Sequence, residues 1–162
     1  MSDGRIFYAE QDGNYCLKFV GDVRVTLCTT LKNYINKIFD ADNVQSIVLD
    51  LTESKAVDST TLGFMAKVAL FANDKNIQPI LITKDASMLR LIEGMGFDEI
   101  CQILSSLPQS DAQLEEMQCT SASTEEARQQ VIEAHRVLMS MNSKNMHAFS
   151  ELVTALERES DY

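Results

Sequence analysis

Hydrophobic positions divide the first hundred residues into short strands and amphipathic helices. Two apolar-rich runs, 5–9 and 15–20, flank the polar segment Glu10–Asn14. The aspartate, glycine and asparagine of that segment favour a tight turn, so the pattern predicts a β-hairpin. Gly21 and Asp22 predict the end of its second strand.

Strands and helices alternate after the hairpin. The apolar centre of 44–51 predicts a strand that is covered on both faces. Further strands are predicted at 78–83 and 100–104, and helices at 27–39, about 60–73 and 86–93. This alternation predicts an α/β fold whose sheet is mixed and mostly parallel, because only the opening hairpin is antiparallel.

The pattern changes after Pro108, where strand-like runs vanish and loop-forming residues become frequent. A mostly apolar stripe then follows helical spacing from Val131 to Leu156, and Ser123 or Thr124 can cap its start. We predict two helices rather than one, interrupted near 142–145, because asparagine and serine are weak helix formers.

The 162 residues fit one domain plus an appendage, which we place at 1–107 and 108–162. A hydrophobic content of 45% is enough for a buried core. Residues 111–162 hold 10 acidic and 4 basic side chains, a net charge of −6 out of −10 for the whole chain. Without clustered lysine and arginine we expect no nucleic-acid binding, and without a long apolar run we expect a cytoplasmic protein with no membrane insertion.

Cysteine and histidine spacing argues against a metal site or a metal cofactor. The two histidines, His135 and His147, lie twelve positions apart, and we expect them at a helix surface or interface rather than as ligands. The four cysteines are widely separated, form no C-x-x-C pair and are expected to be thiols: Cys16, Cys28, Cys101 and Cys119.

The segment 47–63 carries the most specific pattern. A buried strand leads into a loop, and the loop leads into a helix that starts with hydroxyl side chains, at Ser59, Thr60 and Thr61. Ser59 is a reasonable N-cap, since its hydroxyl can accept a backbone N–H. Serine is common at helix starts, so this pattern alone requires no chemistry.

Residues 5–104 resemble the STAS domain of bacterial anti-sigma factor antagonists. The resemblance is strongest in the motif Val57-Asp58-Ser59-Thr60-Thr61-Leu62-Gly63, and the strand 47–51 before it supports the match. Weaker support comes from Gly21-Asp22 and Gly94-Met95-Gly96-Phe97. The resemblance implies a STAS-like fold, followed here by a C-terminal helical extension.

The resemblance also implies a partner switch. The serine after the aspartate, Ser59, would be phosphorylated by an anti-sigma factor that is also a serine kinase. The unphosphorylated form would bind that partner, and a PP2C-type phosphatase would restore it. Thr60 and Thr61 are secondary candidates. The expected partner-binding residues are Asp22, Arg24, Asp58, Ser59, Thr60, Thr61 and Leu62.

Two positions depart from the family pattern. Arg24 stands where many members carry an acidic residue, and it either pairs with a phosphate or a partner's acid or is a solvated surface residue. Thr61 stands where a glycine is common, which changes the loop geometry.

An enzyme and a non-switching scaffold are the alternatives to a partner switch. We expect no catalysis, because a nucleophilic Ser59 needs a nearby base and both histidines lie in the extension. A non-switching STAS scaffold in a signalling or transport-regulating assembly is the main alternative. The extension could pack on the domain, form a homodimer or bind a second partner.

Overall fold

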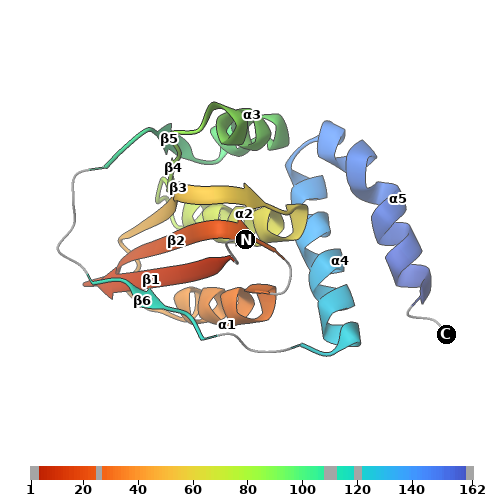
Figure 1. Ribbon diagram of the computed structural model, residues 1–162, viewed down its shortest axis with the longest axis horizontal. Coiled ribbons are helices and arrows are strands. Elements are labelled where there is room, and N and C mark those ends of the chain that lie inside the picture. Colours follow the sequence, from red (N-terminus) through yellow and green to blue (C-terminus); the bar gives the residue numbers. More distant parts are fainter. Residues whose placement is uncertain (1–3, 25–26, 108–112, 119–121, 160–162) are drawn as a thin grey trace.

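The computed structural model describes residues 4–24, 27–107, 113–118 and 122–159, and it shows a mixed six-stranded sheet with five α-helices (Figure 1). The strand order is β5-β4-β3-β2-β1-β6. The strands are β1 (Arg5–Gln11), β2 (Asn14–Val23), β3 (Ser46–Val57), β4 (Ile80–Ile82), β5 (Gln102–Leu104) and β6 (Glu115–Glu116). The α-helices are α1 (Cys28–Phe39), α2 (Ser59–Asp74), α3 (Ala86–Met95), α4 (Thr124–Met141) and α5 (Ser143–Glu159). The α/β prediction is confirmed.

The opening hairpin is present, but its second strand is longer than predicted. Asp12 and Gly13 turn the chain with φ angles of 54° and 84°, as a tight hairpin turn requires. Gly21 does not end β2, which continues to Val23. Instead, Gly21 has a φ of 76° where the pairing with β3 changes register, because glycine tolerates the backbone of such an irregularity.

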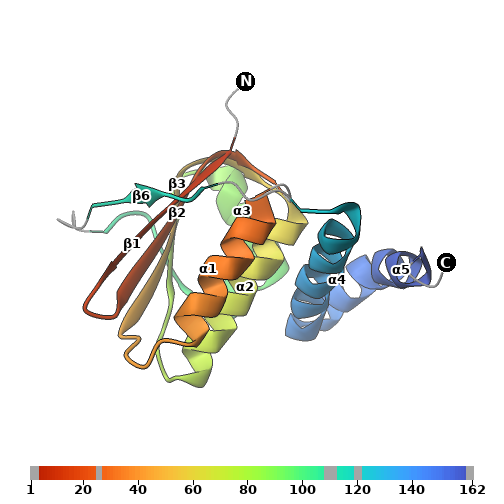
Figure 2. The same ribbon diagram turned by 90° about the horizontal axis from the view of Figure 1, so that it is seen from below.

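The burial pattern of β3 shows that the sheet has one fully buried face. Ile47, Leu49 and Leu51 are at most 1% exposed, whereas Val48 and Asp50 between them are partly exposed. In Figure 2, α1 and α2 lie together on the same side of the sheet. The prediction that this strand is covered on both faces is therefore wrong.

The extension crosses the edge of the sheet before its helices begin. Strand β6, which was not predicted, pairs antiparallel with Phe7 and Tyr8 of β1. It consists of two glutamates, residues that rarely form strands, so only the tertiary contact reveals it.

Two helices complete the extension, as predicted. Ser123, and not Thr124, caps α4 by accepting the N–H of Glu126. Asn142 interrupts the helices, and its side-chain oxygen accepts the N–H of Asn145 at 2.8 Å. Both views place α4 beside α2 and α5 on the outer side of α4 (Figures 1 and 2). None of the helices within the described ranges is long and apolar enough to span a membrane.

Candidate functional site

The site forms where β2 and β3 end side by side. These strands are parallel, and their last pair is Val23 with Val57. The N–H of Asp58 donates to the carbonyl of Val23 at 3.1 Å, and α2 starts at the next residue. Asp58 and Ser59 therefore lie just beyond the C-terminal end of β3, beside the C-terminal end of β2.

Asp58, not Ser59, is the N-cap of α2. Its Oδ1 accepts the backbone N–H and the hydroxyl of Thr61, each at 2.8 Å. An aspartate caps a helix as well as a serine does, and its negative charge also suits the positive end of the helix dipole. The prediction that Ser59 caps the helix is therefore wrong, and its hydroxyl is available for another contact.

Ser59 makes that contact with a histidine of the extension. Its Oγ lies 2.7 Å from Nε2 of His135, and Nδ1 of His135 lies 2.7 Å from the carbonyl oxygen of Val131. A carbonyl can only accept, so Nδ1 carries a proton. In the neutral ring Nε2 is then the acceptor, and the Ser59 hydroxyl donates to it.

The surroundings of His135 hold its ring in place. The residue is 1% exposed, and its ring meets Phe149 of α5 edge-on, with centroids 4.9 Å apart. His135 therefore lies at a helix interface, one of its two expected places, whereas His147 is exposed.

The contact between Ser59 and His135, which are 76 positions apart, was not predicted from the sequence. One sequence signal was available, since His135 stands on the apolar stripe of the extension between Val131 and Leu138. A polar ring on a buried stripe needs a hydrogen-bond partner. That stripe does not identify the partner, which depends on how α4 docks.

The three residues after Ser59 point into the protein. Thr60, Thr61 and Leu62 are 5%, 0% and 1% exposed, and Leu62 belongs to the hydrophobic core. The Thr61 hydroxyl also lies 3.8 Å from Sγ of Cys28. In this structure, Thr60, Thr61 and Leu62 contribute little to the surface of the site.

Asp22 and Arg24 lie at the C-terminal end of β2, on the exposed side of the site. Nε and a terminal nitrogen of Arg24 are each 3.0 Å from Oδ2 of Asp22. This hydrogen bond and the charge of Asp22 raise the pKa of Arg24, and the charge of Asp58 adds to the effect. Arg24 is therefore a surface residue that is paired with Asp22, and the nearby charge of Asp58 also raises its pKa.

Comparisons with known proteins agree with this architecture. The family model of the STAS domain matches residues 6–110. The anti-sigma factor antagonist SpoIIAA in its unphosphorylated form superposes with a TM-score of 0.53 at 11% identity, over 64% of this chain and 89% of that one. An anti-sigma factor antagonist from Mycobacterium paratuberculosis gives 0.52 at 16%, over 65% and 88%. No curated protein sequence matches this chain significantly.

A third solved structure, of a candidate anti-sigma factor antagonist from Thermotoga maritima, gives a TM-score of 0.54 at 17% identity, over 62% of this chain and 86% of that one. At these identities the likeness shows the fold alone. Helix α4, which supplies His135, and helix α5 lie beyond the part that the family model matches. Because the family model matches residues 6–110 and the fold is a mixed sheet with Ser59 just beyond the C-terminal end of β3, the chain belongs to the STAS domain family.

Proposed function

We propose that this protein is an anti-sigma factor antagonist that acts by partner switching at Ser59. The unphosphorylated form binds an anti-sigma factor that is also a serine kinase. The kinase transfers the γ-phosphoryl group of a nucleoside triphosphate to Oγ of Ser59. The hydroxyl loses its proton, a nucleoside diphosphate leaves, and the phosphorylated protein dissociates from its partner. A PP2C-type phosphatase hydrolyses the phosphoserine and restores binding.

The observation that carries the proposal is the position of Ser59 as the first residue of α2. Asp58 already caps the helix, so phosphorylation of Ser59 removes no cap. A helix start favours negative charge, which allows the domain to keep its fold with a phosphate there. The phosphate adds about −1.5 to −2 charges next to Asp58, which is costly to desolvate in an interface.

Catalysis is the competing use of Ser59, since the structure places a histidine beside it that could act as a base, which was not expected from the sequence. Ser59 and His135 have the geometry of a nucleophile and its general base. The third group, however, is the backbone carbonyl of Val131 rather than a carboxylate. A carbonyl orients the ring but offers less stabilisation of an imidazolium than a carboxylate does, so we propose a phosphate acceptor rather than an enzyme.

Phosphosite mapping on protein isolated from its native host tests the proposal. We expect phosphate on Ser59, in the peptide between Lys55 and Lys67, and its loss after phosphatase treatment. Ser87, an exposed serine near the start of α3, is an internal control that should stay unmodified. Absence of phosphate from Ser59 across growth conditions, with full coverage of that peptide, favours a non-switching scaffold.

Variants at Ser59 test the consequence for binding. Ser59→Ala should recover the partner from host extract as the wild type does, and Ser59→Asp should weaken the affinity by about tenfold or more. Equal recovery by the wild type and both variants contradicts partner switching.

A further inference from the structure

The backbones of α4 and α2 come into direct contact at Gly63. A Cβ atom added to Gly63 would lie 2.3 Å from the carbonyl oxygen of Ala134, so the two backbones are in contact there. Ser59 lies one helical turn before Gly63, and His135 follows Ala134, which places the hydrogen bond beside this contact. Helix α4 therefore cannot move closer to α2 or slide past it without separating from it.

A phosphate on Ser59 is incompatible with the present contact to His135. The 2.7 Å between Oγ and Nε2 leaves no place for a phosphorus atom with three further oxygens along that line. Turning the phosphate toward solvent instead breaks the hydrogen bond. In the neutral ring, Nε2 of His135, which is 1% exposed, then remains buried without a donor.

Charge adds to this incompatibility. Glu133 of α4 bridges Lys32 of α1, at 3.0 Å, and Lys67 of α2, and these ion pairs hold the extension on the domain. Residues 111–162 carry a net charge of −6, from 10 acidic and 4 basic side chains. A phosphate of about −1.5 to −2 beside this segment weakens its docking.

The docked interface contains buried polar side chains beside the apolar Ala134 and Leu138 of α4. Gln130, His135 and Asn145 are at most 4% exposed, and Oε1 of Gln130 has no hydrogen-bond partner among the described residues. Buried polar atoms reduce the gain from burying apolar area, and an unsatisfied acceptor reduces it further. Separation of the helical pair from the domain, which Gln130 contacts at α1, His135 at α2 and Asn145 at α3, is therefore less costly than separation of a wholly apolar interface of the same area.

From these contacts we infer that the helical pair α4–α5 is a displaceable cover of Ser59. The pair cannot stay docked when Ser59 is phosphorylated, and Ser59 cannot be phosphorylated while the pair is docked. The inference deepens the proposed function, because it names the regulation of the same site. A kinase must act on the open form, and a partner that docks on the start of α2 competes with α4. The phosphorylated chain keeps its sheet domain while its helical pair is undocked.

Hydrogen–deuterium exchange on the full chain, with phosphoserine incorporated at position 59 during translation, tests this directly. We expect amides of 124–159 to exchange at least about tenfold faster than in the unmodified chain, equivalent to about 1.4 kcal/mol, while β3 keeps its protection. Unchanged or slower exchange of α4 in the phosphorylated chain would contradict the proposal that the helical pair is a displaceable cover. The phosphate is installed without a kinase, so this result does not depend on whether the host phosphorylates Ser59.

A second variant tests displacement without phosphate. Ala134→Leu drives a larger side chain against Gly63, and we expect faster exchange in α4 and α5 with β3 unaffected. The matched control is Ala155→Leu on the exposed side of α5, which should leave exchange unchanged. Loss of protection in β3 together with α4 would show that the pair is an inseparable part of the core, and would overturn the proposal.

Discussion

At the scale of single residues, His135 connects the two parts of the chain. Its Nδ1 is fixed by Val131 within α4, and its Nε2 is satisfied only from outside, by Ser59 of α2. A histidine that needs a partner from another element makes that element's position specific, because any other docking leaves a buried nitrogen unpaired.

Replacing His135 by alanine should lower the free energy of unfolding by about 1–3 kcal/mol, because a buried ring and its hydrogen bond are lost. The exposed His147→Ala variant is the control and should change it by less than about 0.5 kcal/mol. Urea denaturation of both variants measures the difference. Equal effects would show that the contact of His135 with Ser59 contributes nothing specific.

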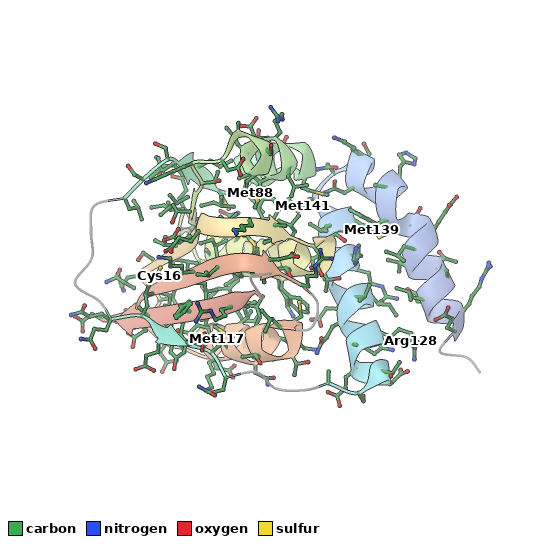
Figure 3. The ribbon with its side chains drawn as sticks, viewed as in Figure 1. Cys16, Met88, Met117, Arg128, Met139 and Met141 are labelled. Atoms are coloured by element: carbon green, nitrogen blue, oxygen red, sulfur yellow. The ribbon has the colours of Figure 1, made fainter. Side chains whose placement is uncertain are left out.

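At the scale of elements, α4 is attached to α1 and α2 by groups of different kinds. Glu133 pairs with two lysines, and the Gln130 amide donates to the Thr29 hydroxyl. On its other side, α4 meets α5 through Arg128, which donates to the carbonyl of Leu156. Figure 3 shows Arg128 and Met139 on the side of α4 that faces α5. The two helices thus form a unit that docks through α4 and also through α5, where Lys144 and Asn145 donate to the carbonyls of Gly94 and Met95 in α3.

The ion pairs of Glu133 predict a pH dependence for this docking. Burial raises the pKa of Glu133, but hydrogen bonds and charges from Lys67 and Lys32 lower it by more, so the net shift is downward. A lowered pKa stabilises the folded state above the unfolded value of about 4.3, and this stabilisation is lost as the pH falls through the folded pKa.

We therefore expect Glu133→Gln to cost about 0.5–1 kcal/mol of unfolding free energy at pH 7 and less near pH 3, because the stabilisation declines as the pH falls toward and through the folded pKa. Denaturation of wild type and variant at both pH values measures this, with Glu151→Gln on the exposed side of α5 as the control. A cost that is the same at both pH values would mean that the carboxylate charge is not what holds α4.

At the scale of the whole molecule, one continuous core joins the sheet to the first helix of the extension. Phe19, Leu49 and Phe64 are fully buried at its centre, and Leu138 of α4 belongs to the same core. Two thiols are buried in it as well. Burial raises the pKa of Cys28 and of Cys101 to about 12 each.

These two thiols should react with a disulfide reagent only when the whole domain unfolds. A thiolate is the reactive form, and a pKa of about 12 leaves almost none near neutral pH. A Cys119→Ser variant removes the cysteine that lies outside the described residues, and mass spectrometry then follows each remaining thiol across a urea series. Fast modification of Cys28 or Cys101 in the absence of urea would contradict the buried core.

The sequence predicted each element whose hydrophobic period was clear. The hairpin, α1, α2, the break at Asn142 and the alternation that makes the fold α/β all follow from local pattern and turn chemistry. Boundaries were less accurate at Gly21, where the pairing with β3 extends the strand, and at Asp58, where the carboxylate out-competes the serine as cap. Strand β6 was missed because two glutamates carry no strand signal.

By itself, therefore, the sequence determined the elements other than β6 and placed Ser59 at the start of a helix, because both depend on near neighbours along the chain. Only the tertiary structure decided what Ser59 touches. His135 is 76 positions away, and its approach depends on a glycine opposite an alanine, on the bridge from Glu133 to two lysines and on the way α4 packs. Such long-range contacts produce no periodic pattern in the sequence, because each residue involved also fits the local pattern of its own helix.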